Sequence, residues 1–567
     1  MRRKIFKNAR IVDVIQKKIY KGWFSVLEGN FEFVEKGDYK DELDGEVMDL
    51  KGLYAIPGFI DSHMHIESSL VTPKVFSQAV IPHGTVAVLQ DPHEMANVFG
   101  KKGVEFMIEN ASGQPLEIYT AIPSCVPTTR KHLETSNAEI TPDDVRELSE
   151  KEGVIALGEV MDYNGVLEGD ERLLKILSIA RERNLSIEGH CPTLRGKDLS
   201  SYLYHGIRSD HTLTNPNKME EQLRKGMYVM IQRKSLTEEN IRFIMGLKDR
   251  SRILMVTDDF LPSDLAVGHL NLLVNLAISK GWDPLDAISS VTIRPAVYLG
   301  LRHLGAISPG KKASFFISES IEEIKPLRVF VKGSPYTSSM LKDTRNFEEF
   351  SNSINLRKLR KEDFRVYKKE YHGHLEVNVI SVDNTENTLT TLSKRILRFE
   401  NGYPVIDASK DISIIAVFKR KEVVPKGCVG FIENIGLRRG AFATTFSHDS
   451  HNILVIGKEI ESMVKAVNSV IEAKGGMSIF IDGKVHLLDL PIGGLITDEP
   501  FERVLYKFQK MESKLRDAGV RHREPVKLFS VLALTVSPFY KMSDLGIVDV
   551  EEGRLLPVVV GEAGQKI

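Results

Sequence analysis

Short apolar segments alternate with longer amphipathic stretches between about residues 55 and 260 of this 567-residue chain. Eight of the apolar segments are candidates for buried strands, and they cover residues 55–60, 85–89, 116–122, 154–157, 185–187, 206–207, 227–231 and 253–256. Helix-like stretches, such as 143–152 and 170–184, lie between several of them. Because strands that alternate with helices form βαβ units, eight such units predict a TIM-type (β/α)8 barrel.

The flanks of the barrel predict two further domains. Clusters of β-branched and aromatic residues mark strands near the N-terminus, and similar signals return after the barrel. The C-terminal third has its own predicted strands and helices. The resulting α/β organisation is a small flanking β domain (1–55 plus 297–340), the barrel (56–296), a charged linker (341–372) and a C-terminal α/β domain (373–567).

Composition excludes several classes of protein. Lys plus Arg number 76 and Asp plus Glu 77, and this balance disfavours a dedicated nucleic-acid binder or a partner of anionic membranes. The longest apolar run, residues 528–536, is too short to span a bilayer, and no signal-peptide pattern is present. Only three cysteines occur, with no CxxC pair, so a disulfide scaffold and a thiolate zinc site are excluded. We expect a cytoplasmic protein that binds neither nucleic acid nor membrane and that forms a homo-oligomer.

Side chains that can bind metal ions follow directly after several predicted strands. They are His63 and His65 after the first strand, Glu159 after the fourth, His190 after the fifth, His211 after the sixth and Asp258 after the eighth. The carboxyl ends of all barrel strands meet on one face, where the active sites of this fold lie. Any one of these residues could instead be a strand-end salt bridge or a hydrogen-bonded core histidine, but their common phase favours a shared site.

The residue types suggest a role for each position. His63 and His65 are two residues apart, so on a strand both imidazoles face the same side and can hold one ion. Glu159 can bridge two ions, and His190 and His211 supply a second imidazole pair. Nitrogen and oxygen ligands without a thiolate fit manganese, iron or zinc and do not select one of them.

Asp258 is the candidate proton acceptor. A carboxylate beside a metal-activated water can hold that water and take its proton. Asp259, the next residue, points to the other side if the strand persists. We therefore rank Asp258 above Asp259 as the residue that acts in catalysis.

Two further groups of polar residues are candidates for substrate binding. His93 and Glu94 follow the second predicted strand, and His448, Asp449 and His451 form a dense cluster in the C-terminal domain. The first pair could equally have a structural role, and the second group could equally be a polar surface turn.

Seven segments carry a resemblance to a known family: residues 57–69, 91–98, 123–127, 157–161, 189–192, 206–211 and 447–452. They resemble the adenine deaminase family of the amidohydrolase superfamily. The resemblance implies hydrolysis of adenine to hypoxanthine and ammonia by a metal-activated hydroxide, a reaction of purine salvage, with Asp258 and Glu159 as catalytic residues. It also implies a binuclear manganese or iron centre, with zinc as a further candidate, held by His63, His65, Glu159, His190, His211 and Asp258.

Four positions depart from the family pattern without removing an expected ligand. Thr212 replaces a usual Glu, Phe260 replaces a polar residue, Asp162 replaces an Asn, and Gln232 begins a segment that usually reads Arg-Glu-Gly-Ser. Two alternatives therefore stay open. One is another amidohydrolase that acts on a different purine, cyclic amidine or cyclic amide. The other is a metal-binding paralogue that has lost catalysis.

Overall fold

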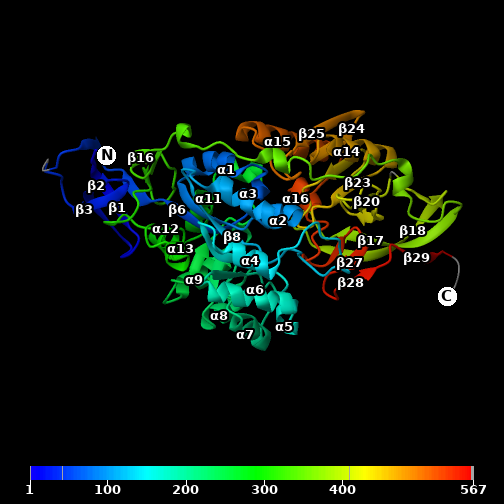
Figure 1. Ribbon diagram of the computed structural model, residues 1–567, viewed down its shortest axis with the longest axis horizontal. Helices are drawn as coiled ribbons and strands as arrows, with labels where there is room; N and C mark the ends of the chain where they lie inside the picture. The colour runs from blue at the N-terminus through cyan, green and yellow to red at the C-terminus, as the bar shows by residue number, and fades with distance from the viewer. Residues whose placement is uncertain (1, 41–42, 408, 564–567) are drawn as a thin grey trace. The chain divides into compact units, whose positions relative to one another are not determined.

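The computed structural model describes residues 2–40, 43–407 and 409–563, and the contacts within it divide the chain into two compact units (Figure 1). Unit 1 comprises residues 1–92, 105–124 and 141–345, and unit 2 comprises residues 93–104, 125–140 and 346–567. Two stretches that follow barrel strands in sequence, 93–104 and 125–140, thus group with the C-terminal part of the chain.

Unit 1 contains two kinds of sheet with helices between the strands. Its strands are β1 (Lys4–Asp13), β2 (Lys18–Leu27), β3 (Asn30–Lys36), β4 (Glu46–Asp49), β5 (Tyr54–Pro57), β6 (Phe59–Met64), β7 (Thr85–Gln90), β8 (Glu117–Ile122), β9 (Val154–Val160), β10 (Ser186–Gly189), β11 (Ser209–Asp210), β12 (Tyr228–Ile231), β13 (Ile253–Met255), β14 (Phe315–Ser318), β15 (Arg328–Val331) and β16 (Ser334–Pro335). Its helices are α1 (Pro73–Val80), α3 (Lys101–Ala111, which crosses the unit boundary), α4 (Pro142–Leu148), α5 (Tyr163–Glu168), α6 (Glu171–Glu182), α7 (Gly196–Tyr204), α8 (Pro216–Arg224), α9 (Glu238–Gly246), α10 (Pro262–Leu265), α11 (Leu270–Ser279), α12 (Pro284–Ser290) and α13 (Ile293–Tyr298).

Strands from both flanks of the barrel form one mixed sheet. Its order is β16-β15-β14-β5-β1-β2-β3, with β4 beside β1. The core of this sheet is aromatic: Phe6 stacks on Phe24, Phe315 stacks on Phe330, and Phe6 meets Phe315 edge-on. The predicted first barrel strand, 55–60, is divided between this sheet and the next one. The division falls at Gly58, where a Cβ would lie 2.4 Å from the side chain of Val86, so only glycine fits between the two packed sheets.

The remaining strands of unit 1 are parallel. They form a five-stranded sheet, β10-β9-β8-β7-β6, and a three-stranded sheet, β11-β12-β13. β6 and β7 are buried along their whole length, as is typical of parallel strands covered on both faces. The α/β organisation predicted for this region is confirmed. The predicted strand at 206–207 is wrong, because Gly206 has a φ of 104° in the turn after α7 and the strand forms at β11 instead.

The helices begin where the sequence places capping residues. Thr141 accepts a hydrogen bond from the backbone N–H of Asp144 at the start of α4, and Asp170 accepts one from Leu173 at the start of α6. Each side chain satisfies a backbone donor that the helix itself leaves unpaired. These helices hold the strands in place and leave the strand ends available for the site.

Unit 2 is built on a ten-stranded sheet of order β19-β18-β17-β21-β20-β23-β22-β24-β25, in which β29 also pairs with β17. Its strands are β17 (Gly373–Val382), β18 (Thr390–Glu400), β19 (Tyr403–Val405), β20 (Ile412–Phe418), β21 (Gly427–Glu433), β22 (Ala441–Thr444), β23 (Ile453–Gly457), β24 (Gly476–Ile481), β25 (Lys484–Asp489), β26 (Tyr540–Met542), β27 (Ile547–Asp549), β28 (Arg554–Leu556) and β29 (Val559–Glu562). Its helices are α2 (His93–Phe99), α14 (Ile460–Glu472), α15 (Phe501–Asp517) and α16 (Pro525–Ser530), of which α14 packs on β22, β23 and β24 (Figure 1).

The segment expected to be a charged linker is packed into unit 2. Leu356, Leu359 and Phe364 are buried in the core that α14 and the large sheet share. Ile354 and Val366 of the same segment pack against this core, whereas Phe347 is 41% exposed. Separately, none of the helices in the described part of the chain is long and apolar enough to cross a membrane.

Candidate metal centre

β6 and the residue that follows it place two histidines at the carboxyl end of the parallel sheet. His63 and His65 are 1% and 2% exposed. His65 Nδ1 lies 2.9 Å from the backbone oxygen of Asp91. Because that oxygen can only accept, Nδ1 carries the proton and the lone pair of His65 is on Nε2. His65 therefore presents Nε2 to the carboxylates around it, as a metal-binding imidazole does.

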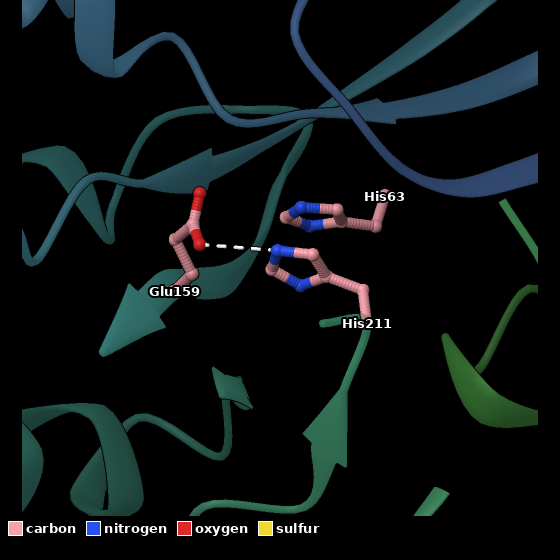
Figure 2. Close-up of side chains that lie close together, drawn as sticks. All are labelled: His63, Glu159 and His211. Atoms are coloured by element: carbon pink, nitrogen blue, oxygen red, sulfur yellow. Dashed lines mark ion pairs between the residues drawn. The ribbon is translucent and has the colours of Figure 1, made fainter. Parts of the chain in front are cut away.

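Glu159, at the end of β9, faces histidines on both sides. Its Oε1 lies 3.5 Å from His65 Nε2, whereas its Oε2 lies 2.6 Å from His190 Nδ1 and 3.2 Å from His211 Nε2. Figure 2 shows Glu159 beside the rings of His63 and His211, which stack with centroids 3.9 Å apart. The two carboxylate oxygens thus serve different imidazoles, which is the arrangement expected of a bridging ligand.

Asp258 follows β13 and closes the site from the side of the three-stranded sheet. Its Oδ1 lies 3.6 Å from His63 Nε2 and 3.3 Å from His65 Nε2. Gln232 donates a 2.6 Å hydrogen bond to its other oxygen, Oδ2. The backbone of Asp258 is left-handed, with a φ of 58°, and forms a parallel bridge with Met64. Non-glycine residues adopt this conformation at an energetic cost, so the fold holds Asp258 in place against its own preference.

Burial and charge set the protonation of these groups. Burial lowers the pKa of His63 to about 4, so this imidazole is neutral near pH 7. Burial alone would raise the pKa of Glu159, but the His211 and His190 imidazoles outweigh it and hold that pKa well below its usual value. Burial likewise opposes ionisation of Asp258, yet the nearby His63 and His65 imidazoles keep its pKa low. The site therefore combines charged carboxylates with a neutral imidazole, the forms that bind metal ions.

The residues present fit divalent metal ions. His63, Glu159 and His211 each offer one ligand atom within 4.8 Å of the others, and so do His63, His65 and Asp258. His63 Nε2 is buried and has no hydrogen-bond partner, which is unusual for a polar atom in a protein interior. A metal ion would satisfy it. The structure thus brings all six predicted ligands together, His190 through its contact with Glu159.

Asp91 is a site residue that the sequence analysis did not single out. It follows β7, its backbone oxygen orients His65, and its Oδ2 accepts a 3.0 Å hydrogen bond from the backbone N–H of Glu159. Gly158 lies against the same carboxylate, and a Cβ there would be 2.2 Å from Asp91 Oδ2. Its position at a strand end, in phase with the other ligands, was the available signal.

The positions that depart from the family pattern have defined partners in unit 1. Thr212 donates a 2.9 Å hydrogen bond to Asp210 and accepts one from Lys218, whose ammonium lies 2.8 Å from Asp210. Phe260 is buried, with its ring centroid 5.8 Å from that of His269. Gln232 binds Asp258 as described above. Asp162 caps α5. None of these four displaces an expected ligand.

The five residues predicted to bind substrate come together in unit 2. His93 and Glu94 begin α2, and His448, Asp449 and His451 follow β22. All five are buried, so the alternative of a polar surface turn is wrong for the last three. Their role in substrate binding stays a prediction.

Comparisons with known proteins identify the relatives of this chain. A model of the amidohydrolase family matches residues 54–338, and a model of the adenine deaminase C-terminal domain matches residues 387–554. An adenine deaminase of Clostridium perfringens is 37% identical over 570 residues, which cover 97% of this chain and 98% of that protein. Adenine deaminase 2 of Carboxydothermus hydrogenoformans is 35% identical over 567 residues, which cover 98% and 96%. The crystal structure of enamidase, at 17% identity, has a TM-score of 0.47 and covers 61% of this chain and 97% of its own.

Proposed function

The chain belongs to the adenine deaminase family of the amidohydrolases, and we propose that it hydrolyses adenine to hypoxanthine and ammonia. One observation carries the proposal: a chain related to adenine deaminases along almost its whole length has its strand-end histidines and carboxylates gathered in one buried cluster. Both the relatedness and the cluster are needed, because either alone is compatible with another hydrolase.

We propose that the cluster holds two divalent ions, manganese or iron, with zinc as a further candidate. His63, His65, Glu159, His190, His211 and Asp258 would be the ligands. When bound, such ions supply Lewis-acid activation of the attacking water. Glu159 would contact both ions, since its two oxygens already face different imidazoles.

Asp258 moves the proton in this proposal. Its carboxylate is ionised, and Gln232 binds Oδ2, so Oδ1 is the atom that faces the reaction. As the new C6–O bond forms, Oδ1 takes a proton from the attacking water. The C6–O bond forms as the electron pair of the ring C6–N1 double bond moves to N1, and the second water proton ends on N1 of hypoxanthine. As the C6–N bond to the amino group breaks, Oδ1 gives its proton to the departing nitrogen, which leaves as ammonia. The proton is therefore returned and the carboxylate is regenerated.

We further propose that the two parallel sheets of unit 1 belong to one eight-stranded barrel. The bridge between Met64 and Asp258 joins the end of β6 to the segment after β13, and β10 contacts β11. These two junctions connect the sheets at both edges. In the cell we propose a cytoplasmic homo-oligomer that takes a small purine and serves purine salvage.

The test is ammonia release from adenine by protein reconstituted with Mn²⁺ or Fe²⁺, beside adenosine, guanine and dihydroorotate. Turnover of adenine alone is the expected result. Turnover of another compound would replace adenine by a different cyclic amidine or amide. If fully metallated protein turned over none of these compounds, the result would favour a metal-binding paralogue that has lost catalysis. Asp258→Asn should lower kcat by about 10²-fold or more, the size of a lost acid–base group.

A further inference from the structure

A second cluster of metal-competent side chains lies wholly within unit 2. It consists of His93, Glu94, His448, Asp449 and His451, which are 4%, 0%, 6%, 3% and 0% exposed. α2 supplies the first two, and the segment between β22 and β23 supplies the other three. Charged and polar groups this deeply buried need partners that compensate for lost hydration.

The donor atoms converge on one point. His93 Nε2 lies 3.7 Å from Glu94 Oε1 and 3.8 Å from Asp449 Oδ1. Single ligand atoms of these three residues all lie within 4.8 Å of one another. His448 joins them, because its Nδ1 lies 3.6 Å from Asp449 Oδ1 and contacts Glu94 Oε1 directly.

Neighbouring groups orient these donors. His451 Nδ1 accepts a hydrogen bond from the backbone N–H of Ser447, so its proton is on Nε2, which is directed at Glu94 Oε2. That bond engages one oxygen of Glu94 and leaves Oε1 for the cluster. His93 Nδ1 lies 3.6 Å from Cys125 Sγ, so its Nε2 is the nitrogen that faces the carboxylates. Outer contacts of this kind fix the ligands of metal sites.

We propose that His93, Glu94 and Asp449, with His448 as the fourth ligand, form a separate site for a first-row divalent metal ion. For bonds of about 2.1 Å, a tetrahedral ion requires its ligand atoms to be about 3.4 Å apart. The three separations of 3.6–3.8 Å are close to that value, whereas His448 Nδ1 and Glu94 Oε1 are in closer contact and would have to move apart when an ion binds. Two imidazole nitrogens and two carboxylate oxygens, without a thiolate, suit zinc, iron or manganese.

Charge balance favours an ion over a closed hydrogen-bond network. Glu94 Oε2 is bonded by His451 and Glu94 Oε1 contacts His448, but neither Glu94 Oε1 nor Asp449 Oδ2, both buried, has a hydrogen-bond partner. A purely structural network of buried polar groups is normally fully satisfied. A cation beside Asp449 would compensate the charge of its carboxylate. The proposal does not depend on the reaction proposed above, because no proton transfer in that reaction uses these residues.

The test counts metal ions per chain in intact protein that has been stripped, reloaded with Zn²⁺ or Mn²⁺ and freed of excess ion. Three ions are expected in the wild type. Asp449→Asn and Glu94→Gln, which keep shape while removing charge, should each lose one ion and keep two. Asp544→Asn is the matched control, because Asp544 is a buried carboxylate of the same unit outside the cluster, and it should keep three.

This experiment distinguishes loss of metal from the centre of unit 1 from loss of metal from the cluster in unit 2. His63→Ala should lose metal from the centre of unit 1 yet retain the ion that Asp449→Asn releases. Wild type that binds only two ions, both lost through unit 1 variants, would overturn the proposal without affecting the deaminase assignment. Variants Asp449→Asn and Glu94→Gln that keep the wild-type metal content and raise only KM for adenine would also overturn it, and would favour substrate contact.

Discussion

Lys218→Met tests the reasoning about the buried ion pair beside the candidate centre. Lys218 and Asp210 have side chains that are each 1% exposed, and their charged atoms are 2.8 Å apart. Removing one partner of such a pair leaves the other charged and buried, at a cost of about 3–5 kcal/mol. Here the lower end applies, because Asp210 keeps hydrogen bonds from Thr212 and Gln222.

A loss of about 3 kcal/mol corresponds to a fall in Tm of about 5 °C or more for a domain of this size. Scanning calorimetry of the metal-loaded protein measures it. Arg224→Met is the control on the same helix, because its partner Glu220 is exposed and surface pairs contribute about 0–1 kcal/mol. The double variant Lys218→Met with Asp210→Asn should recover at least about 1.5 kcal/mol relative to the sum of the single changes.

The pH dependence has a definite sign. Burial opposes ionisation of Asp210, but Lys218 outweighs it and holds the pKa of Asp210 well below its usual value. This contribution to stability is present above the unfolded pKa of about 3.9 and is lost as the pH falls below it. The gap in Tm between wild type and Lys218→Met should therefore narrow below about pH 4. Equal Tm losses for Lys218→Met and Arg224→Met at pH 7 would refute the reasoning.

Four further changes test the site and its surroundings. His63→Ala should lower metal content together with activity, and full metal retention would contradict its assignment as a ligand. Gly158→Ala places a methyl group against Asp91 and should weaken metal affinity by about 10–100-fold in a chelator competition. Gln232→Leu removes a hydrogen bond to a carboxylate and should cost about 1.5–3 kcal/mol, seen as an at least about 10-fold lower kcat/KM. Burial raises the pKa of Glu134 to about 8, so the wild type loses stability as this buried carboxyl ionises between pH 5 and 8. The Tm of Glu134→Gln minus the Tm of the wild type should therefore rise from pH 5 to 8 and stay constant above pH 8. A Tm difference that does not change with pH would contradict this prediction.

Strand positions and ligand identities could be predicted from local pattern. Each predicted barrel strand except 206–207 has a counterpart among β6–β13, because a buried parallel strand needs an apolar run of a few residues and the turn signals beside it. The polar residues that directly follow those runs could also be recognised from the sequence around each strand alone. His63 and His65 could therefore be predicted as a pair of metal ligands before the residues around them were known.

Other features depended on contacts between distant residues. The division of the predicted strand 55–60 at Gly58 follows from the close approach of the Val86 side chain. The sequence around residue 58 does not predict this contact. The burial of residues in 341–372 was not predicted, because a charge-rich segment with scattered apolar residues resembles a linker in sequence. Its apolar residues can be buried only through contacts with a core formed by distant parts of the chain. Asp91 gains its role only because its oxygens meet His65 and Glu159.

By itself, the sequence determined the parallel strands, the residue types at their ends and the family that the chain resembles. These features depend on the local order of residues along the chain. Only the tertiary structure decided which atoms face one another. Glu159 serves His65 with one oxygen and His211 with the other, and Gln232 holds Asp258. It likewise gathered His93 and Glu94 with Asp449 in unit 2. Distances between side chains far apart in sequence are set by how the strands and loops pack, and no local pattern encodes them.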